Sequence, residues 1–168
     1  MKIAKSIIAV LVSSSLLLTS LHAETVFQTV RGENASAPSG GTAADKKLTE
    51  TKDIEGGAKV ARMPGSTSQW GFISFWFGQM VPAGKVVIRF NVYVDDTATA
   101  QFGVYASLKS GQTLIDKLTI PADAKKGSIV AIDLPVDQPE EWNGILLKKM
   151  EASDKPSPWI DSVSVVTP

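Results

Sequence analysis

The sequence predicts an all-β fold, a single β-sandwich or jelly roll of about eight or nine antiparallel strands. Three observations carry this prediction. Short runs of alternating apolar and polar residues recur along the chain, turns rich in Gly, Pro and Asp separate them, and no stretch shows a helical period. Since no repeat of fixed length appears, we expect one domain, covering residues 24–168.

Residues 1–23 are expected to lie outside that domain. Lys2 and Lys5 precede an apolar run from Ile7 to Leu18, and a polar, small-residue segment ends at Ala23. This is the pattern of a secretory signal peptide, and the run is short for a membrane span of about 20 residues. We therefore expect a bacterial protein that is secreted, periplasmic or on the cell surface, with no membrane span after cleavage.

Composition excludes several classes of chemistry. The chain has 168 residues, 17 Lys and Arg against 17 Asp and Glu, no Cys and one His. Removal of residues 1–23 takes away Lys2, Lys5 and His22, which leaves 145 residues, a net charge of −2 and no His. Disulfides, Cys or His metal ligands and Cys- or His-based catalysis are therefore excluded. A charge so close to balance also argues against a nucleic-acid partner.

The first third of the domain holds the weakest strand signals. A β-branched run at 25–30 predicts the first strand, whereas 34–58 is rich in small and polar residues and predicts a loop with one short strand near 47–51. Residues 58–63 form the next predicted strand, which Pro64 and Gly65 end.

The middle of the chain has the clearest alternation. In 70–77, Ile73, Phe75 and Phe77 share one face, and Trp70, Phe72 and Trp76 share the other. After a turn at 82–85, the strand 86–94 places Val86, Ile88, Phe90, Val92 and Val94 on one face. Further strands are predicted at 101–108, 113–120, 128–134, 143–149 and 159–166, with a loop at 135–141.

Aromatic residues are the first candidates for function. Trp70, Phe72 and Trp76 could form an exposed row that stacks on sugar rings, whose C–H faces are apolar. Burial of both faces, in a central strand between layers, is the stronger expectation because aromatic residues dominate cores.

The polar face of strand 86–94 is the second candidate. Arg89, Asn91 and Tyr93 share it, and Tyr105 would stand beside them if strand 101–108 pairs with strand 86–94. Such side chains suit a hydroxylated ligand. The alternative is a solvated outer sheet face, which antiparallel sheets commonly have.

Charged residues carry weaker signals. The carboxylates have no metal-binding or catalytic spacing, and Asp95-Asp96 is expected to serve a turn. The lysine pairs 125–126 and 148–149 are short, and we expect them to be solvated.

Two segments carry a resemblance to a known family. The segment 156–166, with Ile160-Asp161-Ser162-Val163, resembles the last strand of galactose-binding-domain-like jelly rolls, which include carbohydrate-binding modules of the family 6 and family 35 type. The turn Val81-Pro82-Ala83-Gly84-Lys85 matches the one that leads into an alternating strand in those modules.

The resemblance implies a non-catalytic module that binds a glycan or polysaccharide. Ligands in such folds meet loop aromatics at one edge, where Trp70, Trp142 and Trp159 could be platforms, or the concave sheet face. These tryptophans could equally plug the ends of the sandwich. It also implies a structural Ca²⁺, for which Glu33 and Asp161 are the nearest equivalents, although strand 25–30 lacks the glutamates of that motif.

The leading hypothesis is therefore an exported carbohydrate-binding β-sandwich without catalytic activity. The first alternative is a secreted or cell-surface domain that binds other surface proteins. The second is a glycan-active enzyme that uses two carboxylates, because glycosidases need neither Cys nor His.

Overall fold

The computed structural model describes residues 24–36, 50–65 and 71–167. The predicted signal peptide and Trp70 lie outside these residues, as does most of the predicted short strand near 47–51. The elements are β1 (Thr25–Arg31), the 3₁₀ turn η1 (Gly32–Asn34), β2 (Glu50–Asp53), β3 (Lys59–Arg62), β4 (Phe72–Val81), β5 (Gly84–Tyr93), β6 (Phe102–Leu108), β7 (Gly111–Leu118), β8 (Ile129–Gln138), β9 (Trp142–Lys149) and β10 (Trp159–Thr167).

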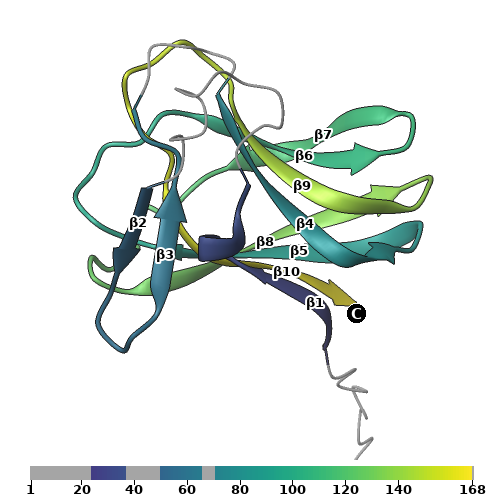
Figure 1. The fold of residues 1–168 in the computed structure, drawn as a ribbon, viewed down its shortest axis with the longest axis horizontal. Coiled ribbons are helices and arrows are strands. Elements are labelled where there is room, and N and C mark those ends of the chain that lie inside the picture. The colour runs from purple at the N-terminus through teal and green to yellow at the C-terminus, as the bar shows by residue number, and fades with distance from the viewer. Residues whose placement is uncertain (1–23, 37–49, 66–70, 168) are drawn as a thin grey trace, which may run out of the picture.

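The strands form two antiparallel sheets that face each other (Figure 1). One sheet has six strands, in the order β2-β3-β10-β5-β8, and β1 also pairs with β10. The other has four, in the order β4-β9-β6-β7. The predicted all-β sandwich is confirmed, with ten strands among the described residues rather than eight or nine.

The core lies between the two sheets, as the alternation requires. Ile73, Phe75 and Phe77 of β4 are buried there against residues such as Ile88 and Phe90 of β5. Phe75 and Phe90 meet edge to face, with ring centroids 6.4 Å apart. Apolar burial of this kind is the main source of stability in a chain without disulfides.

One predicted pairing is wrong. The strands at 86–94 and 101–108 belong to different sheets, because β5 pairs with β8 and β10, whereas β6 pairs with β7 and β9. Tyr105 therefore lies on the opposite side of the sandwich from Arg89, Asn91 and Tyr93. A sandwich chain crosses between its sheets, and alternation alone does not say where it crosses.

Two further expectations fail for reasons of position in the sheet. The predicted loop 135–141 is largely strand, because β8 continues to Gln138 and Pro135 pairs with Val87. Proline is tolerated there since β8 is an edge strand, whose outer side needs no amide donor. β4 is also an edge strand rather than a central one, and because the sandwich has two sheets, no third sheet lies over the outward side of β4.

Candidate functional site

The outward-facing side chains of the four-stranded sheet form the candidate site, which we call the aromatic face. The strand register places its members in neighbouring rows across β4, β9, β6 and β7. They are Phe72, Ser74, Trp76, Gly144, Leu146, Lys148, Gly103, Tyr105, Ser107, Gln112, Leu114 and Lys117. This face combines exposed aromatic surface with amide, hydroxyl and ammonium groups.

Trp76 lies down on the sheet instead of standing away from it. It pairs with Gly144 of β9, and a Cβ atom placed on Gly144 would lie 2.5 Å from Cε3 of the indole. The missing side chain is what lets the ring approach the backbone this closely. With 47% of Trp76 still exposed, the indole remains open to solvent. Burial of both faces of this strand, the stronger sequence expectation, is thus wrong for Trp76.

Tyr105 uses a second glycine in the same way. A Cβ atom on Gly103 would lie 2.9 Å from Cε2 of Tyr105 and 3.1 Å from Cδ1 of Leu114. Gly103 therefore makes room for the phenol ring and for Leu114. Between Trp76 and Tyr105 lies Leu146, which faces outward yet is only 2% exposed. The two rings and this leucine give the face a partly apolar floor.

Lys148 lies over two aromatic rings of this face. Its ammonium is 4.9 Å from the centre of the Tyr105 ring and 5.7 Å from that of Phe72. It also donates a hydrogen bond to Oε1 of Gln112. The attraction of a cation to ring faces and the amide contact hold the ammonium above the sheet.

The predicted polar face on the other sheet is occupied by its own contacts. Arg89 donates to both carboxylate oxygens of Asp133, at 2.7 Å each, and to Glu24 at 3.0 Å. The hydrogen bond from Arg89 holds the pKa of Asp133 below its ordinary value. Asn91 donates to Ser162 at 2.9 Å. These groups therefore stabilise the six-stranded sheet and have little left to offer a ligand.

Tyr93 belongs to a separate cluster with Trp159. Lys52 lies over both rings, 5.1 Å from the centre of Tyr93 and 5.8 Å from that of Trp159. Arg62 lies 4.1 Å from the Trp159 ring, whose Nε1 donates to Asp95 at 2.7 Å. Asp95 also accepts a hydrogen bond from the Thr97 amide, so its expected turn role is confirmed. The cations cover these rings instead of leaving them open.

Trp142 is wrong as a ligand platform. It is fully buried and meets Phe77 with ring centroids 5.9 Å apart. A ring with no exposed face cannot stack on a sugar. Its Nε1 has no hydrogen-bond partner among the described residues, so its contribution is apolar packing.

The structural calcium stays a prediction, and its two candidate ligands lie in different surroundings. Asp161 is 5% exposed, and both its carboxylate oxygens accept from Nη1 of Arg31, at 3.2 and 3.3 Å. Glu33 lies in η1, and the described residues contain no group of three or more acidic or His side chains that could hold a metal. Ca²⁺ takes six to eight oxygen ligands. The charge of Asp161 is instead balanced by a guanidinium.

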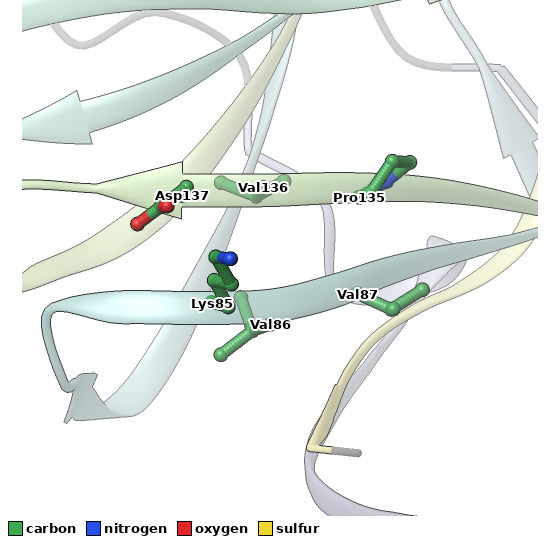
Figure 2. Close-up of a pocket in the computed structure, with 6 residues that line it drawn as sticks. All are labelled: Lys85, Val86, Val87, Pro135, Val136 and Asp137. Carbon is green, nitrogen blue, oxygen red and sulfur yellow. The ribbon is translucent and has the colours of Figure 1, made fainter.

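A shallow depression of about 370 Å³ lies on the six-stranded sheet, where β5 and β8 pair (Figure 2). Its lining residues are Lys85, Val86, Val87, Pro135, Val136 and Asp137. Lys85 and Asp137 face each other in register and are its charged members, while Val87 and Pro135 form an adjacent pair. With no aromatic ring, it lacks the stacking surface that the other sheet offers.

Comparisons of sequence find no relative: no family model matches the chain, and no curated protein matches it. Comparisons of structure do find similar proteins. A family 35 carbohydrate-binding module (CBM35) from Paenibacillus barcinonensis matches with a TM-score of 0.58 and 10% identity, over 84% of this chain and 99% of that one. The chain shares the fold of carbohydrate-binding modules.

Two family 6 modules (CBM6) are similar to the same extent. One, from Cellvibrio mixtus lichenase 5A in complex with cellotriose, has a TM-score of 0.56 and 13% identity, and the match covers 86% of this chain and 99% of the module. The other, from the laminarinase LamC of Zobellia galactanivorans, has a TM-score of 0.55 and 14% identity over 83% and 98% of the two chains. The resemblance noted at the turn and the last strand is confirmed at the level of the fold. The described residues also include no helix with the length and hydropathy of a membrane span.

Of the aromatic face, the sequence pointed only to Phe72, Trp76 and Tyr105 as candidates. The members that it missed include Gly103, Gly144, Gln112 and Lys148. The alternation of β6 and β9 already placed both glycines at outward positions, and that signal was available. Solvation of the lysine pair 148–149 is a wrong expectation. Lys148 lies over two rings, and the buried Lys149 donates to the carbonyl of Ser153, with burial lowering its pKa.

Proposed function

We propose that this chain is an exported, non-catalytic carbohydrate-binding module whose ligand lies on the aromatic face. The observation that carries the proposal is the Trp76 indole lying on Gly144 with much of its surface exposed. An aromatic ring that is already held against a sheet can bind the apolar face of a sugar with little loss of conformational freedom.

The rest of the face supports binding of a hydroxylated ligand. Tyr105 offers a second ring, and Ser107 and Gln112 on the neighbouring strands carry groups that donate to or accept from hydroxyls. The exposed and half-buried members of the face are spread over all four strands, from Trp76 of β4 to Gln112 and Lys117 of β7. This spread suits a chain of sugar units more than a single small molecule. The leader-like segment 1–23 supports export, where polysaccharides would be met.

Binding without catalysis is favoured by the arrangement of the carboxylates. The register positions that make up the aromatic face include no Asp or Glu, whereas a glycosidase needs two carboxyl groups beside the bond that it cleaves.

A glycan-array screen of the purified protein, followed by tryptophan fluorescence, tests this function. Among the tryptophans that the structure describes, Trp76 is exposed and Trp142 and Trp159 are buried. A Trp70→Phe background removes the tryptophan outside the described residues. In that background a bound glycan should shift the emission to shorter wavelength and protect it from iodide quenching.

The control is the same titration in a Trp70→Phe/Trp76→Phe variant, where the shift and the protection should disappear. A screen in which no polysaccharide binds, or binding that leaves the Trp76 signal unchanged, contradicts the proposal.

A further inference from the structure

The outward face of the six-stranded sheet has an apolar row at one end. The strand register aligns four residues in this row: Val26 of β1, Val166 of β10, Val87 of β5 and Pro135 of β8. Both ends of the row are exposed, with Val26 at 56%, whereas Val166 in the middle is 1% exposed. Apolar residues that line up across four strands and stay open to solvent at both ends indicate a contact with another molecule.

The β1 end of this row protrudes. The register between β1 and β10 shifts between Val26 and Gln28, which makes Phe27 the extra residue of a β-bulge. Phe27 is 38% exposed, directly beside the more exposed Val26. These two residues place adjacent apolar side chains at the surface, and we call them the β1 knob.

The β8 end of the row is hollowed by the depression of about 370 Å³ (Figure 2). Four of its lining residues occupy outward positions of the same face as the knob: Lys85, Val87, Pro135 and Asp137. Lys85 and Asp137 carry one charge of each sign, so the depression is neutral as a whole and suits an apolar side chain. Two to three strand spacings, or roughly 12 Å, separate it from the β1 knob.

We propose that two copies of this chain associate through this face, with the β1 knob of each copy in the depression of the other. Knob and depression lie on one face of one molecule, so a two-fold axis brings both pairs into contact at once. The axis runs along the strands, between β10 and β5, and the contact closes into a dimer instead of extending into a fibre. The inference does not depend on the proposed function, because the aromatic face lies on the other sheet and stays open in this dimer.

The charges of the neighbouring rows favour this axis. It sets the exposed Asp133 of one copy opposite the exposed Thr29 of the other, and a hydroxyl donates readily to a carboxylate. A two-fold axis that ran across the strands instead would set Lys85 opposite Arg89 and Asp137 opposite Asp133. Like charges would then face each other in two places, which costs affinity.

The size of the face sets the strength of the contact. Three outward rows over four strands cover roughly 20 Å by 20 Å, from the strand spacing and the rise per residue. Two copies would therefore bury about 800 Å² in total, less than the ~1,200 Å² of a stable interface. We expect a reversible dimer with a dissociation constant on the order of 100 µM.

Sedimentation equilibrium of the purified protein over a range of concentrations on both sides of that value tests the association. The average mass should rise from that of one chain toward that of two. Val26→Glu should raise the dissociation constant about tenfold or more, because its carboxylate would lose water in an apolar depression. The matched control is Ile129→Glu, which changes a residue of similar exposure (43%) at the other end of β8 and should associate like wild type. Circular dichroism of both variants checks that the fold is retained.

The orientation is tested by cross-linking, because the chain has no Cys and an introduced one is its only thiol. A Val26→Cys variant is mixed with a Pro135→Cys variant and treated with a short bismaleimide that spans the ~10 Å between two packed sheets. The mixture should give a cross-linked dimer that contains one chain of each variant. Either variant alone should give little, since the two-fold axis keeps two copies of the same position much farther apart.

Three results would overturn the proposal. The first is a monomer at every concentration, whether residues 1–23 are present or removed. The second is association that Val26→Glu leaves unchanged or that Ile129→Glu weakens equally. The third is cross-linking that is as efficient in one variant alone as in the mixture. Trp76→Ala should associate like wild type, so that loss of glycan binding and loss of self-association are measured separately.

Discussion

The two outer faces of the sandwich use similar residues in opposite ways. On the six-stranded sheet Arg89 is bound by Asp133 and Glu24, and Trp159 is covered by Lys52 and Arg62. On the four-stranded sheet Trp76 lies open on a glycine, and Lys148 has no described acidic partner. A face whose charges and rings contact one another contributes to stability, whereas a face with an exposed ring and an ammonium without a counter-charge has groups to offer the proposed ligand.

The largest expected difference between the faces is in ligand affinity. Trp76→Ala should lower glycan affinity about 30-fold or more, the loss of about 2 kcal/mol that marks a binding hot spot. Tyr93→Ala, which removes an aromatic ring from the six-stranded sheet, should leave the glycan affinity unchanged. Calorimetric titration of both variants measures this. Equal losses in the two variants would show that the faces are not functionally distinct.

A smaller loss is expected when Trp76 is displaced rather than removed. Gly144→Ala puts a methyl group 2.5 Å from the indole, so the ring must lift from the sheet. We expect glycan affinity to fall about tenfold and the free energy of unfolding to fall by about 1–3 kcal/mol.

The matched control for this change is Gly78→Ala in β4. A Cβ atom there would meet its nearest neighbour, Oε1 of Gln28, at an ordinary 3.9 Å. Urea unfolding and titration of both variants should show that the control resembles wild type. Unaltered binding by Gly144→Ala would mean that the position of the ring on the sheet is unimportant.

Changes to the six-stranded face should affect stability and not binding. Arg89→Met breaks the two hydrogen bonds to Asp133 and should cost about 1 kcal/mol in urea unfolding, because the pair is partly exposed. Lys109→Met, which removes a more exposed pair with Glu141 at 4.0 Å, should cost close to nothing. If Arg89→Met weakened glycan binding at unchanged stability, the polar face of this sheet would be a ligand site after all.

The smallest effect concerns acid stability. Arg89 lowers the pKa of Asp133 in the folded protein. The contribution of this ion pair to the free energy of unfolding is therefore fully present above the pKa of an unfolded Asp, about 3.9. It is lost as the pH falls through the lower, folded value. The melting temperature of wild type should therefore approach that of Arg89→Met between about pH 5 and pH 2. A constant difference between the two proteins over that range would contradict the linkage.

Much of the fold follows from local pattern. The alternation in 86–94 and 101–108 correctly separates core residues such as Phe90 and Phe102 from outward ones such as Arg89 and Tyr105. Boundaries failed where a strand lies at a sheet edge, as at Pro135. Burial of Trp142 was one of two open alternatives, because a tryptophan at a strand end has no local signal for the direction in which it points.

The site was only partly predictable. Trp76 and Tyr105 were among the candidates, but they were assigned to different surfaces, with Tyr105 beside Arg89. The structure brings them together with Lys148 and Gln112 because β9 pairs with β4 on one side and with β6 on the other. That pairing joins segments about 40 to 70 residues apart, so no window of sequence contains it.

The sequence by itself determined which side chains lie on the same face of each strand, since a strand alternates with a period of two. It also determined that residues 24–168 contain no Cys and no His, so that neither residue type can serve there in catalysis or metal binding. Only the tertiary structure decided which strands share a sheet, and hence that one face balances its own charges while the other does not. The physical reason is that strand neighbours are selected by burial of the whole core, whereas alternation reports only one strand at a time.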